Sequence, residues 1–191
     1  MDSFLNTDTF FNTKTIEYQY LNAYALSKQN FSEWGKVYAA TENIRFLNIR
    51  LEHIYGPDED SSKFTTWIIR QCLENIVSIP LTAGQQKRDF VFIDDVISGY
   101  NTLIEKLNEI ELGWTDIGLG RGTPVSVRKF VEMVHETTNS TSYLDFGALP
   151  YRHKEIMYSC ADLGVMTAVG WRPNIELKEG INSVIQYERK R

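Results

Sequence analysis

The feature that most constrains this sequence is an alternation between short apolar runs and longer stretches whose apolar residues recur with helical spacing. The run IRFLNIRL at residues 44–51 is dense in Ile, Leu and Phe and predicts a buried strand. It stands between a helical stretch that begins near Asn22 and a second one, FTTWIIRQCLENI. Further strands are predicted at SIPLTAG, at RDFVFI and at GWTDIGLGRG, which ends in glycines, and further helices begin near Asp94, near Ser126 and near Leu177. This alternation predicts an α/β fold in which helices cover a mainly parallel sheet.

The helical stretches carry three local expectations. Residues of the first helix recur at i, i+4, i+7 and i+11, which predicts a stripe that packs against a core: Ser27, Phe31, Trp34 and Tyr38. Asp94 is predicted to be the N-cap of its helix, and Ser126 that of the next one. The stretch after Pro150 is predicted to be irregular as far as GWRP.

The net charge and the cysteine content limit which partners and which cellular compartment suit this protein. The formal net charge of -5 disfavours nucleic acid or an anionic membrane as the main partner, because both attract a cationic surface. No apolar run approaches the roughly 20 residues of a membrane-spanning helix, and no basic stretch precedes an apolar segment at the N-terminus. The two cysteines, Cys72 and Cys160, suit a reducing compartment, so we expect a cytoplasmic protein without a signal peptide.

Tyr24 and Lys28 are the first candidates for chemistry. They are four residues apart, so on a helix they lie on one face within reach of each other. The chain has 10 tyrosines, and about half a Tyr-x-x-x-Lys match is expected by chance alone. The pair therefore needs support from its surroundings.

Two other motifs have simpler interpretations. GLGRG at residues 118–122 stands between a predicted strand and a predicted helix, where a dinucleotide-binding loop would stand. The third glycine of that fingerprint falls on Thr123, which favours a plain turn. The acidic DEDSS run lacks the glycine and glutamate of a calcium loop, and the three histidines show no metal-binding spacing. We predict no metal site.

Two arginines, Arg88 and Arg152, are candidates for contact with a diphosphate. A planar guanidinium binds such a group through two parallel hydrogen bonds, which an ammonium does less well. Either arginine is equally consistent with a solvated surface charge.

Five segments, taken in chain order, resemble the extended short-chain dehydrogenase/reductase family of nucleotide-sugar epimerases, dehydratases and reductases. They are NTDT, YALSK, RLEHIYGP, RDFVFIDDV and the C-terminal YRHKE followed by VGWRP. The resemblance implies that the sequence corresponds to the latter part of such an enzyme, without the N-terminal strands and the glycine-rich phosphate loop. It implies a fold made of the C-terminal part of a Rossmann-like parallel sheet and a small α/β substrate-binding lobe.

The resemblance also implies domain boundaries and site residues. Residues 1–55, joined by about 89–120, would form a remnant of the dinucleotide-binding domain, and residues 56–88 and 121–191 the nucleotide-sugar-binding lobe. The catalytic residues would be Thr7, Tyr24 and Lys28, with Tyr24 as acid/base, Lys28 stabilising its ionised form and Thr7 orienting the sugar oxygen. NAD or NADP would be contacted by Tyr24, Lys28, Glu52 and His53. The nucleotide-diphosphate sugar would be contacted by Asp8, His53, Lys63, Arg88 and Arg152.

The reaction class follows from a departure in the first segment. Dehydratases of the family carry Thr-Asp-Glu where this sequence has Thr7, Asp8 and Thr9, so the base needed for water elimination is missing. The segments look most like the reductases that make 3,6-dideoxy or 6-deoxy sugars, which implies reduction of a CDP- or dTDP-linked 4-keto-6-deoxy sugar. A 4-epimerase and a non-catalytic nucleotide-sugar-binding remnant stay open as alternatives. The family also implies a homodimer through the helix that carries Tyr24.

Overall fold

The computed structural model describes residues 23–191, which form a mixed α/β fold with mainly parallel strands. The helices are α1 (Ala23–Glu42), α2 (Phe64–Leu73), α3 (Ile93–Glu105), α4 (Val127–Thr138), α5 (Gly164–Ala168) and α6 (Leu177–Glu188), with a 3-10 turn at Leu107–Glu109. The strands are β1 (Arg45–Leu51), β2 (His53–Tyr55), β3 (Ser78–Leu81), β4 (Lys87–Arg88), β5 (Phe90–Phe92), β6 (Gly113–Leu119), β7 (Val125–Ser126) and β8 (Tyr143–Phe146). The predicted alternation of strands and helices is confirmed.

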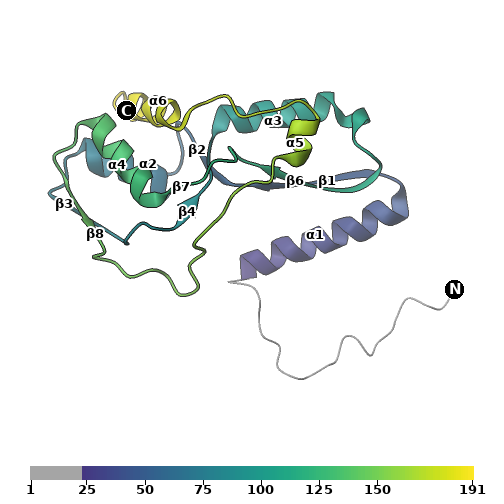
Figure 1. Ribbon diagram of the computed structural model, residues 1–191, viewed down its shortest axis with the longest axis horizontal. Coiled ribbons are helices and arrows are strands. Elements are labelled where there is room, and N and C mark those ends of the chain that lie inside the picture. The colour runs from purple at the N-terminus through teal and green to yellow at the C-terminus, as the bar shows by residue number, and fades with distance from the viewer. Residues whose placement is uncertain (1–22) are drawn as a thin grey trace, which may run out of the picture.

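The strands pair two by two. β1 runs parallel to β6, with Arg45 opposite Gly113 and Leu51 opposite Leu119. The pairs β2–β5 and β3–β8 are also parallel, whereas the short β4 and β7 are antiparallel. In Figure 1, α1 and α3 cover opposite faces of β1 and β6, while α2, α4 and α6 gather at the other end of the molecule with β3 and β8.

The buried apolar side chains form two clusters. One lies among α2, α4 and α6 and includes Tyr55, Ile69 and Phe130. The other lies between α3 and β6 and includes Val96 and Ile117.

Helix α1 packs on the sheet through its small residues. Gly35 and Ala39 are the buried residues of this helix. A Cβ added at Gly35 would lie 2.6 Å from the ring of Phe46 and 2.7 Å from that of Trp114, so only glycine permits this close approach. The Phe46 and Trp114 rings stack on each other with centroids 5.3 Å apart and form the surface that the helix covers.

The predicted core stripe of this helix is therefore wrong. Phe31, Trp34 and Tyr38 are 62%, 75% and 57% exposed. The physical reason is that the helix approaches the sheet through its small residues. The large aromatic residues therefore stay largely exposed, and of these Phe31 contacts the sheet through the Phe46 ring, with centroids 5.9 Å apart.

The helix starts agree with the sequence in one case and not in another. Ser126 accepts a hydrogen bond from the backbone N–H of Lys129 and is the N-cap of α4, as predicted. Asp94 is not the N-cap of α3, because that helix starts at Ile93 and its cap position is Phe92, two residues before Asp94. Asp94 lies instead in the first turn, where a negative charge suits the helix dipole.

No helix among residues 23–191 is both long and apolar enough to cross a bilayer.

Candidate functional site

The candidate site lies where the chain passes from β1, which pairs with β6, into β2, which pairs with β5. The backbone N–H of Glu52 donates to the carbonyl of Leu119, which continues the pairing of β1 with β6. The next N–H, that of His53, donates to the carbonyl of Asp89, which begins the pairing of β2 with β5. In open α/β sheets, ligands bind beyond the carboxyl ends of strands at such a change of order.

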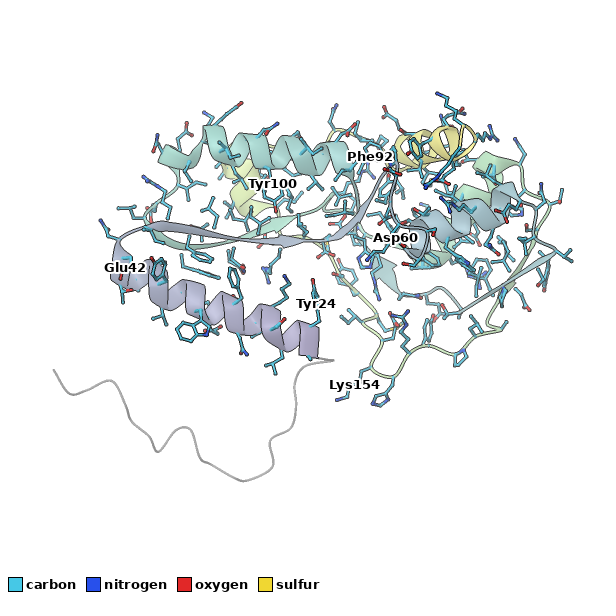
Figure 2. The ribbon with its side chains drawn as sticks, turned by 180° about the vertical axis from the view of Figure 1, so that it is seen from behind. Tyr24, Glu42, Asp60, Phe92, Tyr100 and Lys154 are labelled. Atoms are coloured by element: carbon cyan, nitrogen blue, oxygen red, sulfur yellow. The ribbon has the colours of Figure 1, made fainter. Side chains whose placement is uncertain are left out.

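Tyr24 and Lys28 lie at this same end of the sheet. α1 leads through a short turn into β1, so the helix runs antiparallel to the strand and its first turns lie beside the strand's carboxyl end. The Nζ atom of Lys28 is 5.3 Å from the centroid of the Tyr24 ring, and Tyr24 is 70% exposed. Figure 2 shows Tyr24 at the end of α1 nearer to the loop that carries Lys154. The structure therefore brings together the two residues that the spacing paired.

Glu52 and His53 follow directly after β1. The Ser159 hydroxyl donates a 2.6 Å hydrogen bond to Glu52, which fixes this carboxylate. The His53 ring packs edge-on against Phe90 with centroids 5.8 Å apart. Although solvent reaches part of the ring, partial burial lowers the pKa of His53, and the nearby Arg88 charge lowers it further against the opposing effect of Asp89.

We expect the His53 imidazole to titrate below its ordinary value of about 6.5 when followed by NMR. Folding disfavours the protonated ring, so the contribution to stability is present above the ordinary value and is lost as the pH falls through the lowered one. Replacing Arg88 by glutamine should move the midpoint upward. An unchanged midpoint in that variant would show that the Arg88 charge does not act on His53.

Arg88 and Arg152 have different surroundings. Arg88 is only 8% exposed, and its guanidinium donates to the Lys87 carbonyl at 2.9 Å and to the Glu155 carboxylate at 2.5 Å. Arg152 is exposed and lies three residues before Glu155 in the same loop. Glu155, an acid that the sequence did not single out, pairs with the Arg88 guanidinium, and its backbone N–H donates to the Arg152 carbonyl at 3.1 Å.

The other predicted site residues lie apart from this group or outside the described residues. Lys63 is exposed and occupies the position before α2, where its charge lies near Asp60. Thr7 and Asp8 fall outside residues 23–191. Among the described residues, no group of three potential metal ligands comes together. One cleft, of about 570 Å³, lies elsewhere, between the ends of α2 and α6 and lined by Arg70 and Glu188.

The glycine-rich turn after β6 is filled by a side chain of the protein itself. The carboxylate of Asp89 accepts hydrogen bonds from the backbone N–H groups of Arg121, at 3.0 Å, and Gly122, at 2.8 Å. A Cβ at Gly120 would lie 2.5 Å from the same carboxylate, which explains the glycine there. Backbone N–H groups that would face a phosphate in a dinucleotide loop face an internal anion here. The interpretation of GLGRG as a plain turn is confirmed.

Sequence reasoning missed Asp89, Glu155 and Ser159 as members of this group. The only signal was their position inside the segments RDFVFIDDV and YRHKE, or just after the latter. Ser159 and Glu52 are 107 residues apart in the sequence, and Glu155 and Arg88 are 67 residues apart. Local sequence patterns do not span such separations.

The described residues form an α/β fold with parallel strands, and Tyr24 and Lys28 lie together at one end of it. Residues 6–115 match the NAD dependent epimerase/dehydratase family. The chain belongs to this family.

Individual relatives agree with that assignment. CDP-abequose synthase of Salmonella typhimurium is 40% identical over 97% of this chain and 62% of its own length. Among solved structures, UDP-glucose 4-epimerase of Thermotoga maritima with UDP-glucose is similar with a TM-score of 0.76 and 22% identity, over 87% of this chain and 53% of that one. RMD of Pseudomonas aeruginosa, complexed with NADPH, has a TM-score of 0.73 and 20% identity, over 88% of this chain and 56% of that one. The chain thus spans about 60% of the length of the curated relative it matches.

Proposed function

We propose that the protein containing this sequence is a nucleotide-sugar oxidoreductase. It reduces a CDP- or dTDP-linked 4-keto-6-deoxy sugar with NAD or NADP as the nicotinamide cofactor, in the cytoplasmic synthesis of deoxysugars for O-antigen lipopolysaccharide. The observation that carries this proposal is the placement of Tyr24 beside Lys28 at the carboxyl end of β1, in a chain 40% identical to a CDP-abequose synthase. The free thiols Cys72 and Cys160 support the cytoplasmic location.

The residues present fit a nicotinamide cofactor and a keto sugar. Tyr24 and Lys28 are both exposed and adjacent, so a ligand can reach the phenol and the ammonium together. The hydride for the keto carbon would come from a reduced nicotinamide held by these residues. Tyr24 donates its phenolic proton to the oxygen of that carbon, and the Lys28 ammonium stabilises the phenolate that remains. Glu52 and His53 lie at the strand end where they would contact the cofactor.

We propose that the nucleotide-diphosphate sugar binds mainly to the lobe formed by residues 56–88 and 121–191. Arg88, whose guanidinium is paired with Glu155, and the exposed Arg152 and Lys63 would supply positive charge for the diphosphate, although Lys63 lies on a separate segment before α2. His53 would contact the sugar nucleotide as well. Thr7 would orient the sugar oxygen and Asp8 would contact the sugar. We also propose the lobe boundaries given above, with residues 1–55 and 89–120 on the cofactor side and 56–88 and 121–191 on the sugar-nucleotide side. Met166 and Trp171 pack in the cluster of α3 and β6, so part of the second segment returns to the first side.

A non-catalytic nucleotide-sugar-binding role is the second candidate. It is favoured by the Asp89 carboxylate, which fills the glycine-rich turn after β6. A 4-epimerase would use the same tyrosine and lysine but must let the sugar rotate.

We further propose a homodimer that covers the exposed aromatic residues of α1, Phe31 and Trp34.

Mixing the chain with reduced NADP and a CDP- or dTDP-4-keto-6-deoxy sugar separates these candidates. A ketoreductase lowers the absorbance of the reduced nicotinamide only when the keto sugar is present. Binding of CDP or dTDP without turnover would identify the binding role, and interconversion of 4-hydroxy sugars without net oxidation would identify an epimerase. The absence of both turnover and nucleotide binding would contradict the proposal.

A further inference from the structure

Asp89 is a buried carboxylate whose hydrogen bonds all come from the backbone. The residue is 0% exposed. Its Oδ1 accepts from the N–H of Arg121, and its Oδ2 accepts from the N–H groups of Gly122 and Ala161, the last at 3.1 Å. A buried charge is costly unless such donors compensate it, so these three bonds hold their segments firmly.

These bonds join parts of the chain that are remote in sequence. The donors stand 32 to 72 residues away from Asp89, in the turn after β6 and in the segment before α5. The Asp89 backbone adds a fourth contact, because its carbonyl accepts from the N–H of His53. One residue thus fixes the start of β2, the turn at Gly122 and the segment at Ala161 relative to one another.

The segment fixed through Ala161 carries two side chains of the candidate site. Ser159, two residues earlier, holds the carboxylate of Glu52 at 2.6 Å. Glu155 binds the guanidinium of Arg88, the residue directly before Asp89. The segment has a second anchor in Lys87, which accepts from the Ser159 N–H and donates to the Met157 carbonyl. Releasing Ala161 would remove the other anchor and so weaken the contacts that orient Glu52 and Arg88.

We propose that Asp89 is a positioning residue for the nucleotide-sugar site. It contacts no ligand itself, but its carboxylate sets the position of the backbone that carries Ser159 and Glu155, and through them the orientation of Glu52 and Arg88. This inference rests on the proposed function for the identity of the ligand and on the hydrogen bonds of Asp89 for the mechanism.

The test compares Asp89→Asn with Asp95→Asn in the full chain. Asp95 is a matched control, since it is 3% exposed and accepts from the backbone N–H groups of Asn174 and Ile175, at 2.9 and 3.0 Å, in another part of the fold. Both variants should unfold at a lower temperature, because each leaves backbone donors facing an amide NH₂ group. Only Asp89→Asn should weaken CDP binding, by about tenfold or more, measured by calorimetry well below the unfolding temperature.

Hydrogen exchange provides the second measurement. In Asp89→Asn, the amides of Arg121, Gly122 and Ala161 should exchange about tenfold faster, and the faster exchange should extend to the segment from Arg152 to Ser159. Equal loss of CDP affinity in the two variants, or an Asp89→Asn variant that binds CDP normally, would overturn the proposal. If the unaltered chain binds no CDP, it is the proposed ligand that fails. The exchange result then decides the positioning role, which faster exchange in residues 152–159 supports and unchanged exchange there refutes.

Discussion

Replacing Tyr24 with phenylalanine is expected to lower kcat for reduction of the keto sugar by about 10²- to 10⁴-fold, the usual contribution of a positioned acid. The change removes only the hydroxyl that donates a proton to the sugar oxygen. Tyr24 is 70% exposed and lies next to the Lys28 ammonium, so the loss of one oxygen should leave the fold unaffected. The measurement is the steady-state oxidation of the reduced nicotinamide by the active protein that contains this sequence.

Tyr143→Phe is the matched control for this variant. Tyr143 lies in β8 and is 66% exposed, but it belongs to the far end of the second lobe. It should retain full activity. Similar kcat values for Tyr24→Phe and Tyr143→Phe would remove Tyr24 from the reaction and with it the proposed chemistry.

Phe130→Ala is expected to lower the free energy of unfolding by about 3–5 kcal/mol. Phe130 is 0% exposed, stacks on Phe90 with ring centroids 4.3 Å apart, and meets the Tyr55 ring edge-on. Truncation loses these contacts and leaves a cavity between α4 and the strands that the neighbouring aromatic rings cannot refill. Urea unfolding followed by tryptophan fluorescence measures the change.

Ile104→Ala provides the comparison for that experiment. Ile104 is 70% exposed on α3, so its truncation should change the free energy of unfolding by no more than about 0.5 kcal/mol. A Phe130→Ala variant as stable as Ile104→Ala would mean that the cluster around Tyr55 and Phe130 is not the core of the second lobe.

The order of elements could be predicted from the sequence because apolar spacing along a strand or helix is a local property. The face that α1 turns to the sheet could not, because the usual assumption places large apolar residues such as Trp34 inside. Gly35 and Ala39 instead decide the packing, since they let the helix approach Phe46. Strand β8 was missed for a related reason: it is short, and its pairing partner β3 is remote in sequence.

The candidate site was predictable where its residues share one segment and not where they meet across the fold. The Tyr24–Lys28 pair follows from a spacing of four on a helix, and the structure places the two side chains together. Asp89 and Glu155 belong to the site only through hydrogen bonds to residues far away in the sequence. The sequence marked Asp89 only by its position in the segment RDFVFIDDV, and its burial with three backbone donors became visible in the structure.

We propose that this chain binds a nucleoside diphosphate at the carboxyl end of β1, within reach of Tyr24. Titrating the isotope-labelled chain with CDP while recording backbone amide NMR shifts tests it most directly. We predict that the amides of His53, Asp89 and Ser159 shift in a saturable manner while that of Ile104 does not. Saturable shifts confined to the cleft near Arg70 and Glu188, or no shifts at all, would contradict the account.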